Sequence, residues 1–310
     1  MKMNFNFIVE VLMLPRTMLG ITLLLLAAPG TAVCGAPGSE TSIASPQPSA
    51  ARSLEELDRL PIQDNSFLVE EAYNQEDGVV QHISMFQRLS TGDWGFTQTD
   101  EWPLRSLKHQ LSITLAGTHS GDQPGSGFGW GDTAINYRYQ LVGDGDAKYA
   151  IAPRLSLLLP TGSASLERGY GGVGCQTDVP LSIQHNRYLV THWNAGATWV
   201  PRAQNDLGQR ANSLGFNLGQ STVWLIRPRF NALVETIWNS QPQIIAPGKT
   251  VSQSSIFISP GIRWAYNFRN GLQIVPGIGL PVGVGPSTGQ TGAIFYLSFE
   301  HGLNLAHSRR

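Results

Sequence analysis

The sequence predicts an all-β protein, a transmembrane antiparallel β-barrel of about twelve strands behind an N-terminal signal peptide. Three observations predict this fold class. Only 14% of the 310 residues are charged, whereas an ordinary soluble domain has about 25%. Apolar and polar residues alternate over many long segments, as in strands that face two different environments. After residue 66, no apolar run approaches the roughly 20 residues of a membrane-spanning helix.

Residues 1–36 have the composition of a secretory signal peptide. Lys2 and Arg16 precede an apolar run at 18–28, and small residues follow it. This run of about eleven residues is too short to span a bilayer as a helix. Residues 37–65 begin with a stretch rich in Ser, Ala and Pro, a composition typical of a disordered linker. We therefore expect an exported chain whose folded part begins near residue 66.

Thirteen segments between residues 66 and 300 show the period-two alternation of β-strands. Most of them are longer than a usual strand of five or six residues, and nine to eleven residues cross a bilayer at a barrel's tilt. The segments are 66–74, 78–89, 93–102, 108–117, 130–141, 147–159, 174–184, 188–200, 213–226, 229–239, 254–268, 271–281 and 291–300.

The first segment, 66–74, differs from the others because it carries the adjacent carboxylates Glu70 and Glu71. As a wall strand, it would point one of them at lipid. Closed bacterial barrels also have an even number of strands. We therefore expect this segment inside the lumen or at the periplasmic rim, and twelve wall strands in a barrel that extends over residues 66–303.

The wall segments each have one apolar face, for example Leu155 and Leu157 in 147–159. The other face carries mainly Asn, Gln, Ser, Thr and Gly, where a soluble β-sandwich or propeller would carry Lys, Glu and Asp. Connectors such as "VGDGDAK" and "FRNG" are short. The stretches "GTHSGDQPGSGFGW", "PTGSASLERGYGG" and "NSQPQIIAPGKTVSQS" are expected to be long loops. Short turns at one end and long loops at the other are typical of outer-membrane barrels.

The alternation places a set of polar residues toward the lumen, since a cation facing lipid at mid-depth costs about 2–4 kcal/mol. We expect the three arginines at 138, 154 and 263 to face three carboxylates in a charge ladder. This ladder either braces the barrel or lines a selective path for a solute. The residues predicted to line the lumen are Arg88, Asn136, Arg138, Arg154, Asp178, Glu235, Arg263 and Glu300.

Four prolines interrupt the regular pattern, because each removes a hydrogen-bond donor from a candidate strand. They are Pro153, Pro180, Pro260 and Pro276. We expect them to mark bulges, kinks or a lateral opening in the wall.

The sequence offers no catalytic constellation, no cofactor motif and no metal site. His185 and His192 lie near Ser182 in sequence, but no strained nucleophile turn accompanies them. Cys34 falls in the signal peptide, which leaves Cys175 without a disulfide partner. The formal net charge of −1 gives no basic footprint for nucleic acid.

Several stretches resemble one family of outer-membrane transporters. They are "SFLVEEAYNQEDGVVQHISMFQR", "WGFTQTDEWPLRSLKHQLSITL", "GFGWGDTAINYRYQL", "APRLSLLLPTG" and "GAIFYLSFEHGL". Together they are similar to the family labelled "meta-pathway of phenol degradation", which is related to channels for long-chain fatty acids and aromatic hydrocarbons. The resemblance covers about residues 66–303. It implies a barrel that passes hydrophobic or aromatic compounds, and it supplies no catalytic residues.

Two features depart from the family pattern. Outer-membrane barrels usually end on an aromatic residue, whereas "HGLNLAHSRR" follows Phe299 here, so we treat 304–310 as a tail. Trp130 is an insertion that should alter a loop. The predicted function is an outer-membrane channel or transporter for small hydrophobic or aromatic compounds, with outer-membrane lipid and the barrel-assembly machinery as partners. The alternatives are a structural or plugged barrel without transport activity and an outer-membrane hydrolase.

Overall fold

The computed structural model describes residues 62, 65–104, 106–120 and 127–302. The predicted signal peptide, most of the predicted linker and the tail at 304–310 lie outside the described residues. No helix in this part of the chain is long and apolar enough to cross a membrane. Its helical elements are two short 3-10 turns, η2 at Ala164–Leu166 and η3 at Gly285–Ser287.

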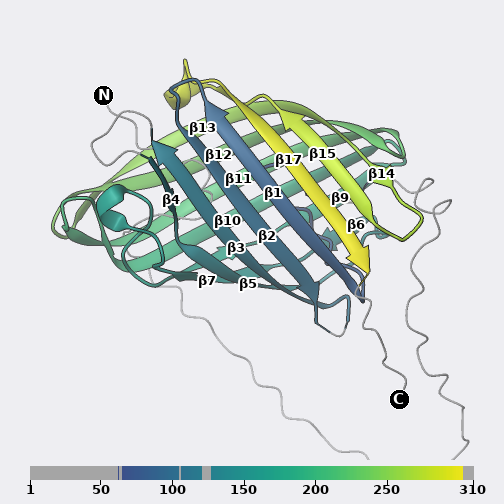
Figure 1. Ribbon diagram of the computed structural model, residues 1–310, viewed down its shortest axis with the longest axis horizontal. Helices are drawn as coiled ribbons and strands as arrows, with labels where there is room; N and C mark the ends of the chain where they lie inside the picture. Colours follow the sequence, from purple (N-terminus) through teal and green to yellow (C-terminus); the bar gives the residue numbers. More distant parts are fainter. Residues whose placement is uncertain (1–61, 63–64, 105, 121–126, 303–310) are drawn as a thin grey trace, which may run out of the picture.

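The described residues form one antiparallel sheet that closes into a barrel, because β1 pairs with both β2 and β17 (Figure 1). Five wall strands are each split by a short break into two labelled strands: β4–β5, β6–β7, β8–β9, β13–β14 and β15–β16. The seventeen labelled strands therefore make 17 − 5 = 12 wall strands, which confirms the predicted number. The strands are β1 Val79–Leu89, β2 Trp94–Pro103, β3 His109–Ser120, β4 Gly127–Trp130, β5 Thr133–Tyr139, β6 Tyr149–Ile151, β7 Arg154–Leu159, β8 Gly174–Asp178, β9 Leu181–Asn186, β10 Leu189–Gln204, β11 Arg210–Arg227, β12 Phe230–Ala246, β13 Lys249–Trp264, β14 Tyr266–Asn267, β15 Gln273–Gly279, β16 Val282–Gly283 and β17 Gly292–Gly302.

The wall has the reverse of a soluble protein's polarity. In β7, Leu155 and Leu157 are 55% and 45% exposed, whereas Arg154 and Ser156, which alternate with them, are buried. This inversion is stable where lipid surrounds the barrel, because lipid solvates apolar side chains and the lumen holds the polar ones. Leu158 is an apolar residue at an inward position of the same strand. It is buried on the lumen side beside Ala134 and Val200.

The two ends of the barrel differ. The end at which β1 begins and β17 ends carries two-residue turns at 187–188 and 228–229, and its longest connection is 140–148. The opposite end carries the longer connections at 160–173 and 284–291 besides a two-residue turn at 247–248. In outer-membrane barrels the shorter turns are periplasmic, and we call the former the periplasmic end.

The prediction of a long loop at "NSQPQIIAPGKTVSQS" was wrong. This stretch extends β12 and β13 into a long hairpin that turns at 247–248. Its backbone groups pair with each other, and Gly248 supplies the positive φ of +71° that the turn requires. Alternation failed to reveal it because most residues here are polar and the apolar Ile244 and Ile245 are adjacent in sequence.

The prolines have two different positions. Pro153 and Pro180 lie at the adjacent breaks β6–β7 and β8–β9, where the carbonyl of Pro180 accepts the N–H of Ala152 at 3.2 Å. Pro260 and Pro276 stay within β13 and β15. Strand pairing continues on both sides of the breaks, so the first two prolines divide strands without ending them.

Candidate functional site

Residues 65–75, which we call the lumen segment, run inside the barrel without joining the sheet. Their backbone is held by side chains of the wall. Glu235 of β12 accepts the N–H groups of Leu68 and Val69 at 2.7 and 3.0 Å through one carboxylate oxygen. Asn194 of β10 accepts the N–H of Glu70 at 2.7 Å and donates to its carbonyl at 2.9 Å. These contacts replace the ladder bonds that a buried backbone needs.

The rest of the segment is held in the same way around the barrel. Ser182 of β9 accepts the N–H of Ala72 at 2.8 Å. Gln140, just after β5, donates to the carbonyl of Ala72 at 2.7 Å, and Gln110 of β3 accepts the N–H of Gln75 at 2.8 Å. The lumen segment is therefore anchored to distant strands, which explains why it crosses the interior.

Glycines in the wall make room for the apolar side chains of the segment. A Cβ added at Gly261 or Gly277 would lie within 2.4 or 2.5 Å of the Phe67 ring, so a larger residue would displace that ring. On its other side, the Phe67 ring packs against Tyr296, with 5.3 Å between ring centroids. Phe67 thus fits a notch that these glycines create between β13 and β15.

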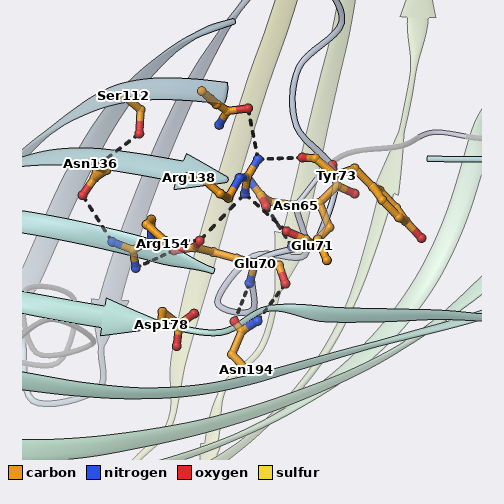
Figure 2. Close-up of polar contacts among 12 residues, drawn as sticks. Asn65, Glu70, Glu71, Tyr73, Ser112, Asn136, Arg138, Arg154, Asp178 and Asn194 are labelled. Carbon is orange, nitrogen blue, oxygen red and sulfur yellow. Dashed lines mark hydrogen bonds and ion pairs between the residues drawn. The ribbon is translucent and has the colours of Figure 1, made fainter. Parts of the chain in front are cut away.

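A charge cluster joins the segment to the neighbouring strands β5 and β7 (Figure 2). The Glu70 carboxylate bonds the Arg154 guanidinium at 2.8 and 3.1 Å and lies 3.8 Å from that of Arg138. Glu101 of β2 lies 3.8 Å from Arg138 on another side. Arg138 also donates to the carbonyl of Tyr73 at 2.6 Å. The two arginines therefore bind both the carboxylate and the backbone of the lumen segment.

Burial also affects the phenol of the segment. It raises the pKa of Tyr73, and the neighbouring Glu71 carboxylate acts in the same direction. Tyr73 therefore stays neutral inside the barrel.

The structure places six of the predicted lumen residues on the inner face and buries them: Asn136, Arg138, Arg154, Asp178, Glu235 and Arg263. Glu300 is half-buried and lies on the same, inner face of β17 as the buried Ser298. Their contacts differ from the expected wall-to-wall ladder, because Glu235 and Arg263 both bond the backbone of the lumen segment. Asp178 accepts a hydrogen bond from Asn217 at 3.3 Å and lies opposite Arg154 in the β7–β8 pair.

The prediction for Arg88 was wrong, because its side chain is exposed on the outer face. The side chains of β1 that point into the lumen are those of Ile83, Met85 and Gln87. Arg88 follows Gln87 and therefore points outward. It immediately precedes Leu89, the last residue of β1. A long cationic side chain so near a strand end can reach the polar interface.

Sequence reasoning missed Glu70 and Glu101 as members of the cluster. Glu70 served only to exclude 66–74 from the wall, although its position in the lumen makes it a partner for the predicted arginines. Glu101 follows Thr97 and Thr99 at every second position of β2, and these threonines also face the lumen. The alternation of this strand could therefore have identified Glu101 as a lumen residue.

A cavity of about 140 Å³ lies between the lumen segment and strands β1, β2, β3, β5, β7 and β17. Its apolar lining comes from Phe67, Leu68, Val69, Ile83, Met85 and Tyr296. Its polar lining includes Glu70, Thr99, Glu101, Thr114, Asn136 and Arg154. A cavity of about 150 Å³ holds a benzene-sized molecule, so this site has room for one small amphipathic compound.

Ser182 and His192, which lie near each other in sequence, are also in contact, with Ser182 Oγ 2.7 Å from His192 Nδ1. Both residues are almost fully buried. The same Ser182 oxygen accepts the Ala72 N–H, so this pair helps to hold the lumen segment.

No family model matches the chain, and no curated protein matches it. Among solved structures, an outer-membrane channel from Pseudomonas putida F1 aligns with a TM-score of 0.57 at 11% identity, over 74% of this chain and 97% of that chain. NanC porin gives 0.48 at 10% identity, over 72% and 100%. A Pseudomonas aeruginosa FadL homologue gives 0.36 at 9%, over 70% and 69%. The first alignment shows that this chain has the fold of outer-membrane β-barrels.

Proposed function

We propose that this protein is an outer-membrane channel for small hydrophobic or aromatic compounds and that the lumen segment is its gate. The observation that carries the proposal is the cavity beside the lumen segment. An apolar wall of Ile83 and Met85 can cover the ring of a small solute, while Thr99, Glu101 and Thr114 supply acceptors for a hydroxyl group. A pore for polar solutes alone does not require a lining that is apolar on one side and polar on the other.

The lumen segment suits a gate because side chains hold it, and water can replace each of these hydrogen bonds. A typical intramolecular hydrogen bond contributes only about 0.5–1.5 kcal/mol net. The wall pairs with itself around the whole barrel, so moving the segment breaks no ladder bond of the sheet.

Liposome swelling tests this proposal. Vesicles that contain the folded protein are exposed to phenol-like solutes and, separately, to a sugar of larger size. We expect faster entry of the phenol-like solute than in protein-free vesicles and no comparable gain for the sugar. Equal entry with and without folded protein would contradict the proposal.

The second candidate is a structural barrel whose lumen stays closed. The hydrogen bonds of the lumen segment to β3, β9, β10 and β12 favour it, because they also fit a permanent plug. Single-channel recording separates the two functions: a channel shows openings that depend on the lumen segment, and a structural barrel stays silent.

The resemblance to the phenol-degradation family supports an aromatic solute, and the predicted signal peptide supports export followed by insertion through the barrel-assembly machinery. We propose that the protein acts as a channel and not as an enzyme. A lipid or peptide hydrolysis assay on the folded protein tests the hydrolase alternative.

A further inference from the structure

Two histidines that are 219 residues apart in sequence meet on the outer face of the barrel, where β1 pairs with β17. The Nε2 atoms of His82 and His301 lie 3.2 Å apart. His82 Nδ1 lies 2.6 Å from the Asp100 carboxylate, and His301 Nδ1 lies 3.2 Å from the carbonyl of Gly302. Gln98 donates to the same Asp100 oxygen at 2.9 Å and holds it in place.

These contacts leave the Nε2 atoms of the two rings facing each other. The Nδ1 atom of each ring lies against an oxygen acceptor, the Asp100 carboxylate or the carbonyl of Gly302. The two Nε2 atoms face each other across 3.2 Å. A metal ion bound between them would take both nitrogens as ligands.

We propose that His82 and His301 bind a divalent transition-metal ion such as Zn²⁺. Two nitrogens bound to one tetrahedral zinc at about 2.0–2.1 Å lie roughly 3.3–3.4 Å apart, close to the observed 3.2 Å. Histidine ligands of metals almost always donate their second N–H to a carboxylate or a backbone carbonyl, and both rings do so here.

Water completes the coordination, since no group of three or more candidate His, Cys, Asp or Glu ligands converges among the described residues. The His82 and Asp100 side chains are 25% and 33% exposed. His301 directly precedes Gly302, the last residue of β17, at the periplasmic end. A cation from the aqueous side can therefore reach the pair, and it would join the first wall strand to the last.

Zinc titration of the full-length folded protein in detergent micelles tests the site. Calorimetry in metal-free buffer should detect one Zn²⁺ bound per chain. The replacement Asp100→Asn should weaken binding by about 10–100-fold, as loss of an outer-shell partner does. His301→Gln should abolish binding.

The matched control is His109→Gln, because His109 is a half-buried histidine whose Nδ1 bonds Tyr137 at 2.7 Å and not a second histidine. It should bind zinc like the unchanged protein. Heat-modifiable migration on gels verifies that each variant is folded. Zinc binding that survives in His301→Gln, or a pair that only takes up a proton without binding zinc, would overturn the proposal. Either result leaves the channel proposal untouched.

Discussion

Replacing Glu70 with alanine should release the lumen segment while the barrel stays folded. The Glu70 carboxylate bonds Arg154 at 2.8 and 3.1 Å. Removing one partner of a buried ion pair costs about 3–5 kcal/mol. Because the Glu70 side chain is 30% exposed and Asp178 still lies opposite Arg154 in the variant, we use the lower bound of about 3 kcal/mol. Each 1.4 kcal/mol or so is a factor of ten, so the population with a displaced segment should rise about 100-fold.

Single-channel recording in planar bilayers measures this population as the open probability. Asp77→Ala is the matched control, because Asp77 is an exposed carboxylate between the lumen segment and β1. The double variant Glu70→Gln, Arg154→Gln replaces the ion pair with two neutral amides, and its open probability should lie nearer to that of the unchanged protein. An unaltered open probability in a folded Glu70→Ala variant would refute the gate and favour the permanent plug.

Three further predictions concern the wall. Gly261→Val should push Phe67 out of its notch, because even a Cβ would lie 2.4 Å from the ring, and should raise the open probability of the folded barrel. Arg138→Gln should lower the free energy of unfolding by about 3–5 kcal/mol, whereas the exposed Arg88→Gln should change it by no more than about 0.5 kcal/mol; urea unfolding in micelles compares them. Met85→Trp should fill the 140 Å³ cavity and slow phenol entry into vesicles without loss of heat-modifiable migration.

Alternation predicted the wall well because each strand has lipid on one side and the lumen on the other. In 147–159, it separated the exposed Leu155 and Leu157 from the buried Arg154. It failed for the hairpin at 239–254, where most residues are polar and Ile244 and Ile245 are adjacent, so no period of two appears. It also failed for Arg88, because a cation near a strand end can avoid lipid without facing inward.

The lumen contacts were beyond sequence reasoning for a different reason. Glu235 and the amide of Leu68 are 167 residues apart, and Asn194 and Glu70 are 124 apart. No local pattern specifies such pairs, because they depend on closure of the whole barrel. The adjacent carboxylates of 66–74 showed that the segment was no wall strand, but they could not show which arginine Glu70 would meet.

The charges of the wall bear on whether the lumen segment can leave. Arg138 and Arg154 are directly opposite each other in the β5–β7 pair, and two like charges in that register repel. With the segment in place, Glu70 lies between them. Without it, Glu101 still lies 3.8 Å from Arg138, and Asp178 stands opposite Arg154 in the β7–β8 pair.

The wall by itself thus holds two cations and two carboxylates, whereas the cluster with Glu70 has one negative charge in excess. If the segment were a permanent plug, the plug itself could supply the main negative charge that faces the arginines of the wall. Here the counter-charges of the emptied lumen are already built into β2 and β8. Displacing the segment therefore costs its hydrogen bonds to the wall and the ion pair of Glu70. It leaves neither Arg138 nor Arg154 without a facing carboxylate, which is an electrostatic condition that a reversible gate requires.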